Sequence, residues 1–182
     1  AATTTGYNNV AIGEASLDLN TTGLWNVAVG VGALTAATTA NSNTAIGTSS
    51  LANATTGAQN TAVGHQAGYT NTTGASNVAM GFECLNLNTT GANNTALGYR
   101  ALLACTTGAS NVAVGYAALD TLTTGTENVG IGKNALDRLT TAGANTALGA
   151  EALNRNVTGD GCTGIGFQAL EVVTGGTNTA LG

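Results

Sequence analysis

Few residues of this chain are of types that could carry out chemistry. His65 is the only histidine, and the three cysteines are Cys84, Cys105 and Cys162 among 182 residues. Catalysis needs a nucleophile, a base and a group that orients them, and a zinc site needs several Cys or His ligands at fixed spacings. The sequence offers neither set, so we expect no enzymatic activity, no metal and no cofactor, and we expect His65 to be a solvated side chain.

An aromatic strip is the feature that could bind a ligand. Phe82, Tyr99 and Tyr116 recur every seventeen residues, Tyr69 lies earlier, and Arg100 follows one of the rings. One interpretation is an outward aromatic ladder that stabilises stacked strands. The alternative is a surface strip that contacts a carbohydrate or a receptor.

The seventeen-residue spacing belongs to a repeat that runs through the whole chain. We number its positions one to seventeen; nine intervals are seventeen residues and the last is sixteen. A period this short and strict predicts a solenoid in which each coil contacts only its neighbours. Residues 1–182 therefore form a single repeat array, which we expect to be a segment of a longer fibre. The copies begin at Asn9, Asn26, Asn43, Asn60, Asn77, Asn94, Asn111, Asn128, Asn145, Cys162 and Asn178.

Glycine and proline indicate how each coil is built. The chain has 27 Gly and no Pro, as a stack of hydrogen-bonded strands requires, because Pro cannot donate to a β-ladder. Position five is Gly in every copy, as in Gly30, Gly47 and Gly64, and position fifteen is nearly as regular. We expect two corners with positive φ or close backbone approach, and short β-like runs between them, one before the first Gly and one around Ala101 and Leu102.

Aliphatic residues predict the inside of the coil. Position four is apolar in every copy and position nine is Leu in nine of ten, as in Val29, Ile46, Val63, Leu34 and Leu51. We expect both columns inside, with a local defect or an intruding neighbour where Gly68 replaces Leu. Positions three and eight are small throughout, which suggests a second close-packed surface that parallel chains could cover.

Polar residues form ladders of the same regularity. Asn26, Asn43 and Asn60 share position one, and Thr39 and Thr56 share position fourteen. Side chains stacked in register can hydrogen-bond along the axis, so these ladders are predicted to be structural. An ice-binding Thr face is the alternative, but it needs Thr residues two apart on one face, whereas positions thirteen and fourteen are adjacent.

Composition argues against several other functions, and the repeat positions of the cysteines argue against a disulfide. Charged residues make up 7% of the chain and the net charge is −5, with four basic residues, which argues against nucleic-acid binding. No apolar run approaches the ~20 residues of a membrane helix. The three cysteines occupy different repeat positions, so we predict no disulfide within the chain.

The repeat unit resembles a known family of fibre repeats. Asn9-Val10-Ala11-Ile12-Gly13 and Asn26-Val27-Ala28-Val29-Gly30, each followed by a Thr-Thr-Gly corner, are similar to the YadA-head type of left-handed β-roll. The unit also resembles repeat shafts of phage tail fibres and bacterial surface fibres, although its period is longer than that of the YadA-head unit. The resemblance implies a parallel homotrimer on a virion or cell surface.

These observations predict an all-β fold, a left-handed parallel β-roll of about eleven coils. The expected function is that of a fibre shaft, a rigid extracellular spacer for attachment that associates with copies of itself. The alternatives are an adhesin that binds host-surface glycans along its side and an ice-binding solenoid.

Overall fold

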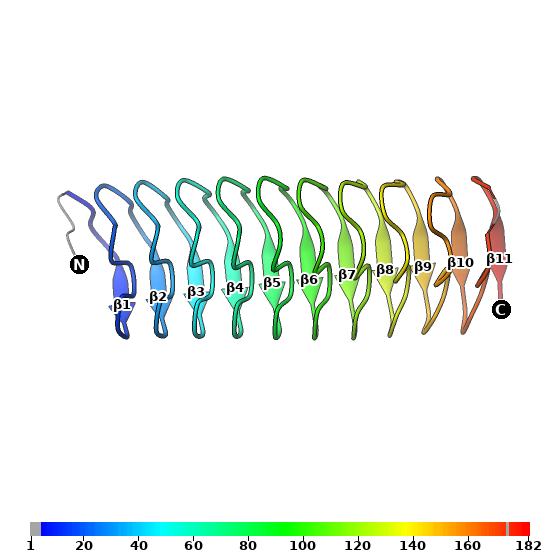
Figure 1. Ribbon diagram of the computed structural model, residues 1–182, viewed down its shortest axis with the longest axis horizontal. Coiled ribbons are helices and arrows are strands. Elements are labelled where there is room, and N and C mark those ends of the chain that lie inside the picture. Colours follow the sequence, from blue (N-terminus) through cyan, green and yellow to red (C-terminus); the bar gives the residue numbers. More distant parts are fainter. Residues whose placement is uncertain (1–4, 174) are drawn as a thin grey trace.

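The computed structural model describes residues 5–173 and 175–182, which form one parallel β-solenoid. Each coil contributes one three-residue strand to a single eleven-stranded sheet, and the rungs follow one another from the N-terminal to the C-terminal end (Figure 1). No described residue is in a helix. The strands are β1 (Val10–Ile12), β2 (Val27–Val29), β3 (Thr44–Ile46), β4 (Thr61–Val63), β5 (Val78–Met80), β6 (Thr95–Leu97), β7 (Val112–Val114), β8 (Val129–Ile131), β9 (Thr146–Leu148), β10 (Thr163–Ile165) and β11 (Thr179–Leu181).

The register confirms the period. Ile12 pairs with Val29 and Val29 with Ile46, seventeen residues apart each time, whereas Thr163 pairs with Thr179 at sixteen. The second expected β-run, around Leu102, is not a strand but a turn. Its backbone still bonds from coil to coil, as in the Leu102 amide that donates to the Ala118 carbonyl at 3.0 Å.

The prediction for position four was wrong. Ile46 is 40% exposed and Val29 and Val63 are partly exposed, whereas Ala28 and Ala45 at position three are fully buried. Alternation along a strand sends positions two and four to one face and position three to the other. The inward face is the one with the small residue.

The width of the coil explains this choice. Gly130 replaces Ala at position three in β8, and a Cβ atom added there would lie 3.2 Å from the Leu119 side chain. The sheet therefore stands so close to the Leu column that only Ala or Gly fits between them. Positions three and eight, which suggested a second packing surface, form the core instead.

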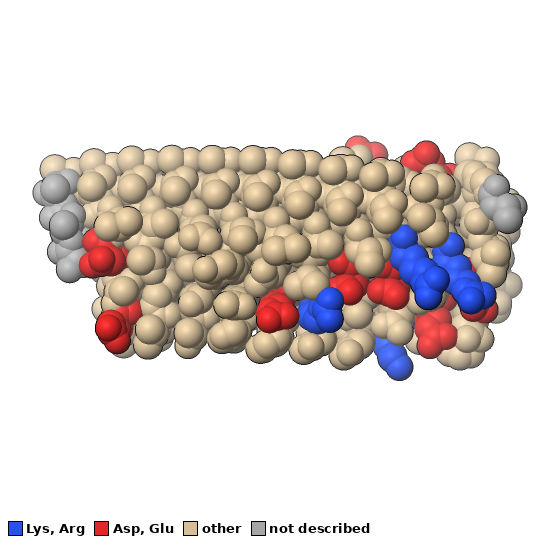
Figure 2. Space-filling view, viewed as in Figure 1, with Lys and Arg blue, Asp and Glu red and all other residues tan. Residues whose placement is uncertain are grey.

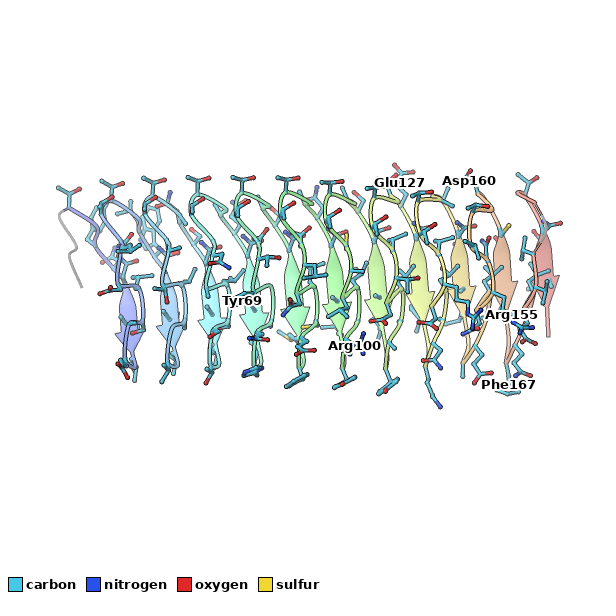
Figure 3. The ribbon with its side chains drawn as sticks, viewed as in Figure 1. Tyr69, Arg100, Glu127, Arg155, Asp160 and Phe167 are labelled. Carbon is cyan, nitrogen blue, oxygen red and sulfur yellow. The ribbon has the colours of Figure 1, made fainter. Side chains whose placement is uncertain are left out.

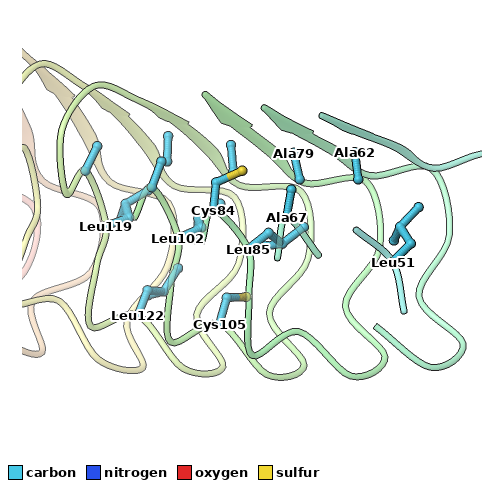
Figure 4. Close-up of a cluster of buried hydrophobic side chains, with 14 of the residues drawn as sticks. Leu51, Ala62, Ala67, Ala79, Cys84, Leu85, Leu102, Cys105, Leu119 and Leu122 are labelled. Atoms are coloured by element: carbon cyan, nitrogen blue, oxygen red, sulfur yellow. The ribbon is translucent and has the colours of Figure 1, made fainter. Parts of the chain in front are cut away.

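Four columns make up this core, at positions three, eight, nine and twelve (Figure 4). The expected Leu column at position nine is confirmed, with Leu34 and Leu102 fully buried and Leu51 2% exposed. Position twelve is a further buried column, with Leu122 and Cys105, that the sequence analysis missed.

Gly68 interrupts the Leu column as expected, and its neighbour fills the space. A Cβ atom placed on Gly68 would lie 2.9 Å from a Leu51 methyl group, which shows that the Leu51 side chain leans into the gap. The column therefore continues without a cavity at this coil.

Positions five and fifteen favour glycine for different reasons. At position five, Gly47 has φ +129° and an added Cβ would lie 2.5 Å from the Gly64 carbonyl oxygen. At position fifteen, Gly57 does not have positive φ, but an added Cβ would lie 2.5 Å from the Gly74 oxygen. Close approach of successive coils thus disfavours side chains at both corners, although position fifteen is Ala40 and Ala142 in two copies, and positive φ adds to the restriction only at position five.

Positive φ also occurs at residues other than glycine. Positions seven, nine and seventeen adopt the left-handed conformation, as in Arg100 (φ 54°), Leu102 (φ 53°) and Asn93 (φ 60°). A bulky residue rarely adopts this conformation, which costs about 1–2 kcal/mol. Full burial of a Leu side chain contributes about 1.5–3 kcal/mol, which offsets that cost at position nine.

The Asn ladder at position one is confirmed as a structural spine. The Asn60 side-chain amide donates to the Asn43 side-chain oxygen at 3.2 Å and to the Gly74 carbonyl at 2.9 Å, and the Asn60 backbone amide also donates to that Asn43 oxygen. Asn43 is linked in the same way to Asn26. Each buried Asn side chain therefore donates to a backbone carbonyl of its own coil and is hydrogen-bonded to the Asn of the neighbouring coil.

Candidate functional site

The aromatic residues at position six form a stacked column, which we call the aromatic column: His65, Phe82, Tyr99 and Tyr116. Ring centroids lie 5.2 Å apart between His65 and Phe82, 5.5 Å between Phe82 and Tyr99, and 5.1 Å between Tyr99 and Tyr116, with planes within 13° of parallel. His65 is therefore the end of the stack, whereas the sequence suggested only a solvated side chain. Its shared position six with Phe82 was the signal that could have placed it.

Tyr69 and Arg100 do not extend this column. Tyr69 takes part in none of the ring contacts of the described residues. In the view of Figure 3 it lies between the upper and lower edges of the rod, whereas Phe167 at position six lies at the lower edge. Arg100 is beside the column in sequence, but its guanidinium pairs with the Asp120 carboxylate at 3.3 Å. The predicted five-residue strip is thus a three-residue column with His65 added.

Stacking decides what the aromatic column presents to solvent. Phe82 and Tyr99 each have a ring on both sides, so neighbouring rings cover both of their faces. Carbohydrates bind aromatic residues through an open ring face, which Phe82 and Tyr99 do not offer. Only the end rings, His65 and Tyr116, each have one face without a ring contact. The geometry therefore favours the interpretation of a ladder that stabilises stacking.

The second candidate site is the outer sheet face, formed by the outward side chains at positions two and four of β1 to β11. Position two is Val or Thr and position four is aliphatic or Met in every coil, with no charged residue at either. Ile46, Met80 and Leu148 are 40–45% exposed. A continuous uncharged face of this length is unusual on a chain that is otherwise in contact with water.

Charged residues gather elsewhere. None occurs between residues 19 and 82, and in the view of Figure 2 the basic residues lie toward the C-terminal half. Asp120 and Asp137 are stacked at position ten, where burial raises the pKa of both carboxyls above the usual range. The Arg100 charge opposes the rise in the pKa of Asp120, and the Arg138 charge opposes it at Asp137.

The cysteines are buried free thiols. Burial raises the pKa of Cys84 to about 12 and that of Cys105 to about 11, so neither forms a reactive thiolate near neutral pH. Among residues 5–173 and 175–182 no three His, Cys, Asp or Glu side chains are placed to hold a metal ion, and no pocket is present. The same residues include no helix with the length and apolar character needed to cross a membrane.

The Thr residues form two ranks with different roles. At position thirteen the Thr38 hydroxyl donates to the Thr55 carbonyl at 3.2 Å, and this bond recurs from coil to coil. Thr39 and Thr56 at position fourteen are exposed instead, so the hydrogen bonds expected of them belong to the preceding residue. The exposed Thr residues make a single rank, whereas an ice-binding face needs two.

Comparisons of the chain with protein-family models, with curated proteins and with solved structures found no match. The fold itself defines the class: a parallel β-solenoid repeat protein.

Proposed function

We propose that this chain is the structural shaft of a fibre, a rigid spacer whose chains associate through the outer sheet face. The observation that carries the proposal is the uninterrupted register of eleven strands, each paired to the next in parallel. Bending such a rod stretches backbone hydrogen bonds and disturbs the packed core in every coil, so the rod resists bending. On the resemblance of its repeat we place it on a virion or cell surface.

The outer sheet face supports self-association. Eleven rungs ~4.8 Å apart, with outward side chains ~7 Å apart on each strand, make a face of about 50 by 10 Å, or on the order of 500 Å². That is at the upper end of the apolar patches that monomers expose. The best partner for a surface with this period is one with the same period, which another copy of the chain supplies.

Charge agrees with this arrangement. Positions two and four exclude charge in every coil, although charged residues occur at positions six and seven directly beyond the Gly corner. Solvent alone would not exclude charge from an exposed face. A dry contact between copies would, because burying an unpaired charge is costly.

Sedimentation equilibrium at micromolar concentration tests the proposal. Val63→Asp combined with Val114→Asp places two charges on the outer sheet face, and we expect it to convert an oligomer into a monomer with an unchanged β-sheet circular dichroism spectrum. Thr56→Asp combined with Thr107→Asp adds the same charge to exposed position fourteen and should leave the oligomer intact. A wild-type chain that stays monomeric would refute the association.

A further inference from the structure

We propose that Tyr99 and Tyr116 form an oxidative cross-linking site, at which a one-electron oxidant joins the two phenol rings by a carbon–carbon bond between adjacent coils. The inference does not depend on the proposed shaft function, because it uses only the geometry within one chain.

The two phenol rings have the proximity and the exposure that coupling needs. The two ring centroids are 5.1 Å apart with planes 10° from parallel, and the side chains are 41% and 54% exposed. The other two tyrosines are differently placed: Tyr7 contacts Trp25 edge-on, and Tyr69 makes no ring contact. Among the described residues this is thus the one pair of phenols in contact.

The solenoid keeps the two rings together. The Ala117 amide donates to the Tyr99 carbonyl at 2.9 Å, and the Asn134 amide donates to the Tyr116 carbonyl at 2.9 Å. These bonds hold consecutive coils at the ~4.8 Å spacing of a sheet. Two groups held side by side react at a far higher effective concentration than two that must meet by diffusion.

The chemistry balances with a peroxide as oxidant. Each phenol gives up one electron and its hydroxyl proton, which produces two phenoxyl radicals. The radicals combine through the ring carbons ortho to the oxygens, and the hydrogens on those carbons move to the oxygens and restore both phenols. The chain loses two hydrogen atoms in total, and hydrogen peroxide accepts them to become two molecules of water.

The product would tie one coil to the next with a bond that thiols do not reduce. Exposure of both rings leaves them free to rotate from a stacked to an edge-to-edge arrangement, as the new bond requires. Phe82 stacks on the Tyr99 side of the pair, and no further ring stacks on Tyr116, so the Tyr116 ring can turn without displacing a neighbouring aromatic ring beyond the pair.

The test oxidises dilute full-length chain with a haem peroxidase and hydrogen peroxide, and separately with a ruthenium photo-oxidant and persulfate, which needs no enzyme access. We expect blue dityrosine fluorescence, a monomeric chain lighter by two hydrogen atoms, and a cross-linked peptide that contains both Tyr99 and Tyr116. Tyr99→Phe keeps the stack but should abolish all three signals. Tyr69→Phe is the matched control and should keep them.

Two results would overturn the site. One is the absence of an intrachain cross-link under both oxidants when free tyrosine in the same tube couples. The other is a cross-link that maps to Tyr7 or Tyr69, or that persists in Tyr99→Phe.

Discussion

The contributions of an inward and an outward side chain to stability can be compared by replacing Leu with Ala at one position of each kind in the same coil. Leu97 at position four and Leu102 at position nine lie in the same coil, but Leu102 is fully buried and Leu97 faces outward. Leu102→Ala removes three buried carbons, worth about 0.8 kcal/mol each in transfer, and leaves a cavity between neighbouring Leu residues. We therefore expect it to lower the unfolding free energy by about 2–5 kcal/mol. Leu97→Ala leaves no cavity and should cost about 1 kcal/mol or less.

Urea denaturation of monomeric, dilute protein measures both costs, and amide hydrogen exchange locates them. Because each coil contacts only its neighbours, Leu102→Ala should lower protection in coils near residues 94–110 and leave residues 26–42 unchanged. At higher concentration the cost of Leu97→Ala should grow, since association buries that side chain, whereas the cost of Leu102→Ala should not. Equal costs in dilute protein, or a larger cost for Leu97, would refute the assignment of inside and outside.

Three further predictions test the Gly corners, the Asn ladder and the buried carboxylates. Gly47→Ala should cost about 2–4 kcal/mol in urea denaturation because of its close approach to the next coil. Gly32 also has positive φ (67°), but an added Cβ there would meet nothing closer than 3.5 Å, so Gly32→Ala should cost only about 1–2 kcal/mol. Asn94→Ala removes the buried side-chain hydrogen bonds to Gly108 of its own coil and to Asn111 of the next coil, and it should cost about 2–4 kcal/mol by the same assay. Asn93→Ala, at an exposed residue with positive φ, should cost about 1 kcal/mol or less. Burial raises the pKa of Asp137, so the ionised carboxylate destabilises the fold at pH values above the usual carboxyl pKa. Asp137→Asn should therefore stabilise the protein at neutral pH. Urea denaturation near pH ~3 should show no gain in stability, because Asp137 is then protonated in both the folded and the unfolded protein.

The repeat made the architecture predictable from the sequence. The seventeen-residue spacing gave the parallel register, the recurrent Leu gave one core column, and the recurrent Asn gave the spine. These features follow from periodicity alone, because an in-register stack brings equivalent residues together whatever path the coil takes. The shorter last interval is matched by Thr163 pairing with Thr179.

Hydrophobicity could not predict which face of each strand points into the core. Alternation separates position three from positions two and four, but a scale that ranks Ile and Val above Ala places the wrong face inside. Size variation carried the missing signal. Position three admits only Ala or Gly, whereas position four admits side chains from Val29 to Met80, and a narrow interior restricts size more than an open face does.

The place of His65 in the aromatic column and the left-handed residues were missed for different reasons. His65 was judged alone, without the observation that it shares position six with Phe82. The left-handed backbone of Leu102 has no signal in the sequence, because a bulky residue disfavours that conformation by itself. Only the packed interior that receives its side chain makes the conformation favourable.

This dependence on neighbours bears on the proposed shaft. A single coil would carry the cost of its left-handed residues without the Leu column, the Asn spine or the sheet that offset it, so it could not hold its shape alone. Each added coil makes the same contacts as the last, and stability therefore grows with length. With the Ala side of each strand filling the interior, the larger aliphatic side chains remain outside along the whole rod. A rod that grew by this rule would extend its outer sheet face in proportion, so association between copies should strengthen with the number of coils.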